Sequence, residues 1–127
     1  MKLERLDHFG LEVADLARAE RFYTEVLGLG VVAQLGDQTL LQCGDQNLAL
    51  FQVPREALSP GRRRDRIAHP LGRGHHAFRV NRVDFETARE RFTAAGVECA
   101  NNIDWGDHDC LYFLDPDGNL LEIVSYR

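Results

Sequence analysis

The chain of 127 residues is long enough for about one domain with a buried core, and its formal net charge of −5 disfavours nucleic acid and anionic membrane surfaces as partners. No apolar run approaches the ~20 residues of a membrane span, and the first residues lack the pattern of a signal peptide, so we expect a cytoplasmic protein. Three cysteines without close pairing argue against a disulfide framework and against a cysteine-built zinc site.

The first half of the chain reads as a strand, a helix and three further strands. Residues 8–13, HFGLEV, alternate like a half-buried strand, and an amphipathic helix follows between a capping Asp15 and Gly28. Short β segments with turn residues continue to residues 47–53, NLALFQV. The pattern predicts a βαβββ module over about residues 1–53.

A segment rich in structure-breaking residues comes next. Residues 54–73 hold three of the four prolines, two glycines and the arginine-rich stretch GRRRDR, residues 61–66. This composition predicts an exposed linker rather than a buried element. We interpret the arginines from Arg62 to Arg66 as a solvated mobile loop, with an anion-binding lid as the alternative.

The second half repeats the order of the first. Residues 75–80, HHAFRV, precede a helix that Asp84 is expected to cap and Gly96 to close, and strands follow to residues 119–125, NLLEIVS. A second βαβββ module is therefore predicted over about residues 74–127. Because neither module alone would bury much core, we expect both to share a single domain over residues 1–127.

Three ligand-type residues stand at related positions of these strands. Strand side chains alternate, so apolar residues facing the helix leave His8 and His75 on the opposite face of their sheets. Glu122 lies inside an apolar strand, where a carboxylate is costly unless it is paired. Two histidines and a carboxylate form a triad that suits a divalent metal with open positions. The alternative reading of each residue is an ordinary polar side chain of a strand.

Three stretches carry a resemblance to a known family, namely residues 6–29, 74–80 and 112–123. With them the chain resembles the vicinal oxygen chelate superfamily, which includes glyoxalase I, extradiol dioxygenases, fosfomycin-resistance transferases and bleomycin-resistance proteins. The resemblance implies an α+β fold of two βαβββ modules that form an open eight-stranded cup. It also implies one divalent metal ion, which is Fe, Mn, Ni, Co or Zn, at the matching positions His8, His75 and Glu122.

Departures from the individual families narrow the chemistry. Alignment of the Asn-Leu pairs sets Leu50 opposite Glu122, where glyoxalase I enzymes carry a ligand carboxylate, so standard glyoxalase I activity is not expected. Fosfomycin transferases have a threonine where Gly10 stands and a lysine in the second half, whereas the only lysine here is Lys2. Extradiol dioxygenases have a histidine where Asn102 stands.

Further candidate site residues lie around the predicted triad. Tyr112 stands ten residues before Glu122 and is expected to be its cross-strand neighbour, either as a proton donor or only as part of the cup wall. Trp105 and His108 belong to a predicted rim loop, where they are candidates for substrate binding or remain exposed without a role.

The strand alternation adds two charged side chains to the inner face. Glu12 and Arg79 are candidates for acid–base catalysis and for binding an anionic substrate, unless they only neutralise each other.

The expected function is that of a metal-dependent enzyme. Such an enzyme would chelate adjacent oxygens of a small substrate and stabilise an oxyanion or enolate, with lyase, isomerase, transferase and dioxygenase chemistry all open. The alternative is a metal-free small-molecule binding protein of the bleomycin-resistance type. The resemblance also implies a homodimer, in which the linker over residues 54–73 would permit an exchange of modules between subunits.

Overall fold

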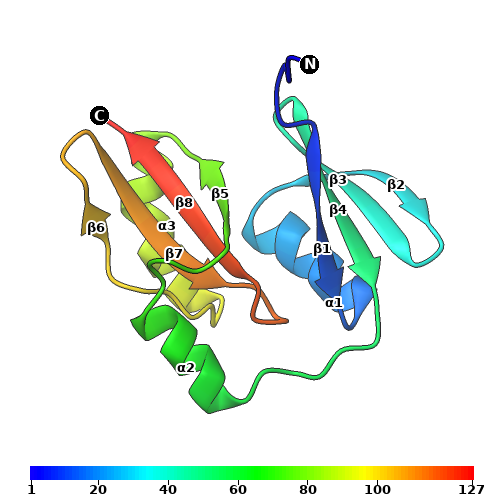
Figure 1. Cartoon of the computed structure of the whole chain (residues 1–127). Helices are drawn as coiled ribbons and strands as arrows, with labels where there is room; N and C mark the ends of the chain where they lie inside the picture. Colours follow the sequence, from blue (N-terminus) through cyan, green and yellow to red (C-terminus); the bar gives the residue numbers. More distant parts are fainter. The chain divides into compact units, whose positions relative to one another are not determined.

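The computed structural model describes all 127 residues, which fall into two compact units, Met1–Ala57 and Leu58–Arg127 (Figure 1). Each unit contains one four-stranded sheet built in the order βαβββ. The predicted α+β class and the predicted repeat are therefore confirmed. No helix of the structure combines the length and the apolar character needed to cross a membrane.

The first unit has its strands in the order β1-β4-β3-β2, with β1 parallel to β4. Asp15 caps α1 as predicted, because its side chain accepts the backbone N–H of Arg18 at 2.9 Å, and Gly28 adopts a positive φ of 76° after the helical segment. The elements are β1 (His8–Val13), α1 (Leu16–Arg21), the π-helical η1 (Phe22–Val26), β2 (Gly30–Leu35), β3 (Gln38–Cys43) and β4 (Gln46–Gln52).

The core of the first unit lies between this sheet and its helix. Leu11 and Val13 of β1 are buried as their alternation predicts. Leu50 pairs with Leu11 in the register of β1 and β4 and is also completely buried. Leu50 therefore belongs to the apolar face of the sheet, together with Leu11.

The second unit has its strands in the order β5-β8-β7-β6, with β5 parallel to β8. The long helix α3 packs on one face of this sheet, where the rings of Phe92 and Phe113 lie 4.5 Å apart between centroids (Figure 1). The elements are α2 (Pro60–Ala68), β5 (His76–Arg79), α3 (Arg82–Ala94), β6 (Ile103–Asp104), β7 (His108–Leu114) and β8 (Leu120–Tyr126).

The predicted linker contains the helix α2, so the prediction of a solvated loop at the arginine cluster is wrong. Ser59 caps α2 by accepting the N–H of Arg62 at 3.2 Å, and Pro60 stands in the first turn, where its fixed φ suits a helix. Arg63 then anchors the helix through an ion pair with Glu98 at 2.7 Å. Pro and Gly in the first turn of a helix do not interrupt it, because the N–H groups there have no intrahelical partner.

The cap of α3 also differs from the prediction. Asn81, and not Asp84, is the N-cap, and its side-chain oxygen accepts the backbone N–H of Asp84 at 2.8 Å. Asp84 lies in the first turn, where its carboxylate accepts a hydrogen bond from the Asn81 amide at 2.8 Å. Both residue types favour caps, and composition alone did not choose between positions three residues apart.

Candidate metal site

One face of the second sheet carries the candidate site. In the register of β7 and β8 Tyr112 pairs with Glu122, as predicted, and Ala77 of β5 pairs with Glu122 from the other side. The register depends on a tight connection in which the Asp115 carboxylate accepts the N–H groups of Asp117 and Asn119, both at 2.9 Å.

Glu122 is paired with a histidine, as its position in an apolar strand requires. Glu122 is only 7% exposed, and its Oε2 lies 2.9 Å from Nε2 of His75, which stands immediately before β5. The structure thus brings together two of the three predicted metal ligands. Glu122 belongs to β8, and His75 directly precedes the neighbouring strand β5 of the same sheet.

The second ring nitrogen of His75 determines what Nε2 can do. Nδ1 lies 2.8 Å from the carbonyl oxygen of Arg73, and because a carbonyl only accepts, Nδ1 is the donor. Nε2 then faces the carboxylate of Glu122 at the distance of an ordinary ion pair, which is favourable when Nε2 carries a proton or when a cation is bound by both side chains. Two metal ligands at right angles, with bonds of about 2.1 Å, lie about 3.0 Å apart. The observed separation of 2.9 Å fits this arrangement.

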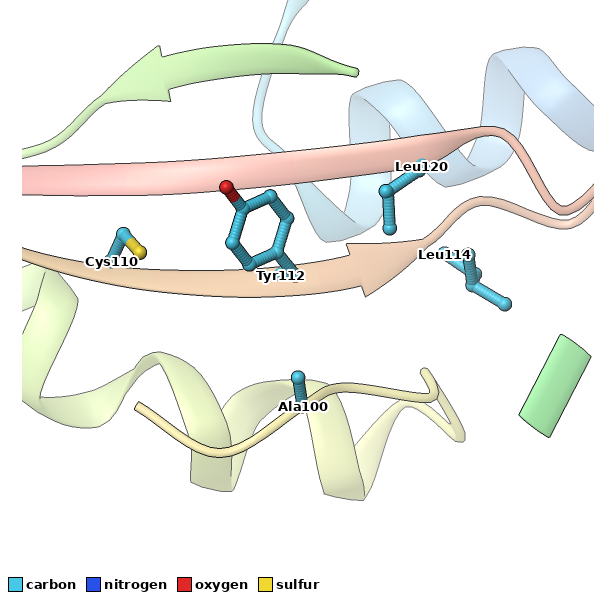
Figure 2. Packing of buried hydrophobic residues seen from close by; sticks show 5 residues of the cluster. All are labelled: Ala100, Cys110, Tyr112, Leu114 and Leu120. Atoms are coloured by element: carbon cyan, nitrogen blue, oxygen red, sulfur yellow. The ribbon is translucent and has the colours of Figure 1, made fainter. Parts of the chain in front are cut away.

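Tyr112 borders this pair as a proton donor. Its ring makes an edge contact with that of His75, with centroids 5.1 Å apart, and its phenol points from β7 toward β8 (Figure 2). Burial, assisted by the negative charge of Glu122, raises the pKa of Tyr112 to about 12. The phenol therefore keeps its proton at neutral pH and can donate it in a hydrogen bond.

Cys110 lies one strand step from Tyr112 on the same face and is free and buried (Figure 2). Burial raises the pKa of the Cys110 thiol to about 11. The indole N–H of Trp105 donates to Cys110 Sγ at 3.3 Å, which fixes the predicted substrate-binding residue Trp105 against the sheet. A buried thiol that stays neutral acts as a structural residue.

The predicted residues His108 and Arg79 lie farther along the same face. His108 begins β7 and pairs with Tyr126 of β8, and its ring stacks between those of Trp105 and Tyr126. The guanidinium of Arg79 lies over Tyr126 at 5.0 Å from the ring centroid. Sequence reasoning missed Tyr126, although the predicted pairing of Tyr112 with Glu122 already implied its pairing with His108.

The remaining predicted ligand belongs to the first unit. His8 begins β1 with an exposed side chain, and its Nδ1 donates to the Asp7 carboxylate at 2.7 Å, which leaves Nε2 available for a metal. Glu12 shares this strand face and is exposed. Within either unit, no group of three or more His, Cys, Asp or Glu side chains is arranged to hold a metal ion. Ligation by His8 together with His75 and Glu122 therefore stays a prediction.

The position related to Glu122 by the repeat is occupied by Ala49 and not by Leu50. Gly10 pairs with Ala49 in the first sheet as Ala77 pairs with Glu122 in the second. The alignment by Asn-Leu pairs was wrong by one residue, which moves a side chain to the other face of a strand. Its consequence is unchanged, because alanine cannot ligate a metal either.

Comparisons with known proteins agree with this fold. The family model of the Glyoxalase/Bleomycin resistance protein/Dioxygenase superfamily matches residues 5–123. Glutathione transferase FosA of Serratia marcescens is 33% identical over 121 residues, covering 95% of this chain and 80% of that protein. Metapyrocatechase 2 of Cupriavidus necator is 33% identical over 120 residues, covering 93% of this chain and 32% of that protein.

A solved structure gives the same result. The lactoylglutathione lyase of Agrobacterium tumefaciens has a TM-score of 0.74 and 26% identity, covering 98% of this chain and 96% of that one. Together with the match over residues 5–123, the repeated βαβββ units show that the chain belongs to the Glyoxalase/Bleomycin resistance protein/Dioxygenase superfamily.

Proposed function

We propose that the chain is a divalent-metal-dependent enzyme that binds a small substrate through two adjacent oxygens. The proposed ligands are His8, His75 and Glu122, with one ion per site. The observation that carries the proposal is the 2.9 Å separation of His75 Nε2 and Glu122 Oε2 while Nδ1 of His75 is held by a backbone carbonyl. Imidazole and carboxylate donors accept Fe, Mn, Ni, Co or Zn.

The chain's own residues prepare this site in separate ways. A bound cation would polarise the substrate oxygens and stabilise an oxyanion or enolate. The carbonyl of Arg73 fixes the ring of His75, so that Nε2 is presented to the site. Tyr112 keeps its proton and is placed to donate a hydrogen bond beside Glu122. Leu114 and Leu120 continue the buried cluster beyond Tyr112 and exclude water from that side (Figure 2).

Two reaction classes are disfavoured by residues of the first unit, although relatives carry names from both. A threonine in place of Gly10 would meet the ring of Phe51, because even a Cβ there would lie 2.8 Å from Phe51 Cε2, and the only lysine is Lys2. Fosfomycin transfer is therefore not expected, despite the 33% identity with FosA. Ala49 supplies no carboxylate, so we expect little turnover of the methylglyoxal–glutathione hemithioacetal.

A second candidate function is that of a metal-free small-molecule binding protein of the bleomycin-resistance type. The observation that favours it is the pair of half-exposed aromatic rings of Trp105 and Tyr126, on the same sheet face as Glu122. Such a protein has no need for the pairing of His75 with Glu122, so metal binding separates the two candidates.

Elemental analysis of the purified protein tests the proposal. We expect about one divalent ion per chain, and a sharp loss of occupancy in the variants His8→Ala, His75→Ala and Glu122→Ala. The matched control is His69→Ala, which removes a histidine of the second unit that is not a proposed ligand and that lies at the end of α2. Equal occupancy in all four variants would place the ions elsewhere and refute the proposal. If the ions are lost in the three ligand variants, the metal-loaded protein is screened for activity on catechols, epoxides and α-keto hemithioacetals.

A further inference from the structure

Four side chains form a continuous stack on the open end of the second sheet, which we call the aromatic row. It consists of Trp105, His108 and Tyr126, with Arg79 over the last ring. The rings of Trp105 and His108 are near parallel at 19° with centroids 6.3 Å apart, and those of His108 and Tyr126 at 30° and 4.9 Å. Arg79 extends the stack at 5.0 Å from the centroid of Tyr126.

The rings of the row are exposed and yet held in place. Trp105 is 51% and Tyr126 49% exposed, which is much for side chains of this size. Trp105 is fixed by its hydrogen bond to Cys110 Sγ, and His108 by a hydrogen bond to the Asp107 carboxylate at 2.6 Å. A ring surface that is ordered before binding loses little conformational entropy when a ligand packs against it.

The row lies on the same face of the second sheet as His75 and Glu122. Tyr126 is four residues beyond Glu122 on β8, which corresponds to about 13 Å along a strand. Arg79 of β5 pairs with Val124 of β8, which lies two residues beyond Glu122 on the same face of the sheet. A ligand bound at Glu122 would reach the row with the part of the molecule that does not react.

Arg79 brings an uncompensated positive charge to the row. No carboxylate of its unit pairs with Arg79, whereas Arg82 and Arg127 both pair with Asp109. A cavity of about 420 Å³ opens beside Arg79 and Tyr126. A guanidinium over a ring, next to an open cavity, suits a negatively charged group attached to a flat one.

We propose that the aromatic row binds the distal group of the substrate, and that this group is flat, conjugated and negatively charged, as in an aryl carboxylate. That the bound group belongs to the substrate rests on the proposed function, whereas binding to the row rests on the residues of the row alone. The faces of Tyr126 are covered by His108 and Arg79, so the flat group packs against the exposed ring edges of Tyr126 and Trp105, and its carboxylate pairs with Arg79.

The fluorescence of Trp105 reports on the row directly, because it is the only tryptophan of the chain. The full chain, treated with EDTA, is titrated with naphthalene-2-carboxylate, which is flat and anionic but has no adjacent chelating oxygens. We expect saturable quenching. Naphthalene-2-carboxamide, which is flat but neutral, and cyclohexanecarboxylate, which is charged but not flat, should each bind about tenfold more weakly, as the loss of one ionic or aromatic contact predicts.

Two variants separate the contributions of charge and ring. Arg79→Gln should weaken binding of naphthalene-2-carboxylate about tenfold and leave the carboxamide unchanged. Tyr126→Leu should weaken both compounds about three- to tenfold. The control is Arg91→Gln, which removes an exposed arginine of α3 whose partner is Asp84. Circular dichroism verifies that each variant is folded.

Three results would overturn the inference: no saturable change in fluorescence, cyclohexanecarboxylate bound as tightly as the naphthalene compound, or Arg79→Gln without effect. Because the titration contains no metal, a failure of metal binding at His75 and Glu122 would refute the proposed function and leave this result standing.

Discussion

The ring of Phe51 limits what can stand at position 10. An added Cβ at Gly10 would lie 2.8 Å from Phe51 Cε2, which is too close unless the partly exposed ring moves. We expect Gly10→Thr to lower the free energy of unfolding by about 1–2 kcal/mol, as overpacking does. Urea denaturation measures this loss.

A double-mutant cycle identifies the ring as the cause. In the Phe51→Ala background the same Gly10→Thr change should cost much less, because neighbouring residues couple. If the two changes were simply additive, the cost at Gly10 would have an origin other than the ring of Phe51.

The thiol of Cys110 should be inert although it lies beside the proposed site. Burial raises its pKa to about 11, so at pH 8 only about one molecule in a thousand carries the reactive thiolate. We expect iodoacetamide at pH 8 to label the partly exposed Cys99 well before Cys110, as measured by peptide mass spectrometry. In urea Cys110 should become labelled as well. Equal labelling of both thiols in the folded protein would contradict this burial.

At the residue level, alternation along single strands was a reliable guide. It placed His75 and Glu122 on one face and predicted the pairing of Glu122 with Tyr112, because both follow from local geometry. The comparison between the repeats was less reliable. Ala49, rather than Leu50, matches Glu122, because the register of β4 is set by its pairing with β1 and not by the turn that precedes it.

At the level of elements, α2 depends on a single arginine for its attachment. Arg63 is 18% exposed at its side chain, donates to both carboxylate oxygens of Glu98, and also donates to the carbonyls of Asp115 and Pro116, each at 3.0 Å. Its guanidinium thus joins α2 to the segment before β6 and to the connection between β7 and β8.

Removal of this guanidinium should loosen the helix. We expect Arg63→Met to lower the free energy of unfolding by about 2 kcal/mol, because charged hydrogen bonds are lost and carbonyl groups lose their donor. The neighbouring Arg64, which is exposed, serves as the control, and Arg64→Met should change stability by less than about 0.5 kcal/mol. Chemical denaturation followed by circular dichroism compares the two. Equal losses would mean that the contacts of Arg63 stabilise nothing.

The sequence predicted both βαβββ modules but missed α2, and the reason is physical. Pro60 and Gly61 read as breakers, yet they occupy the first turn after the cap Ser59, where a missing N–H costs nothing. The anchoring of the helix by Arg63 to Glu98, 35 residues away, is a tertiary contact that no local pattern contains. Tertiary contacts of this kind decide whether a short segment of mixed propensity becomes helical.

At the level of the whole molecule, the edge strand β2 exposes apolar side chains that a partner could cover. It is the last strand of the order β1-β4-β3-β2, and its apolar residues Val31, Val32 and Leu35 are exposed. Exposed edge strands pair readily with further chains, and a symmetric dimer of identical patches is the commonest way to cover them. We therefore propose a homodimer. Light scattering at micromolar concentration should give about twice the 14.4 kDa of one chain, and Val32→Lys should lower that mass.

A mixing experiment decides whether the two subunits share their metal ligands. His8→Ala and His75→Ala each disable the site on their own, and each is expected to purify without metal. If His8 ligates together with His75 of the other chain, a mixed dimer regains one intact site, and random reassortment should restore about a quarter of full occupancy. If all ligands come from one chain, mixing restores nothing. A mass of one chain with full metal occupancy would refute the dimer and show that a single chain completes the site.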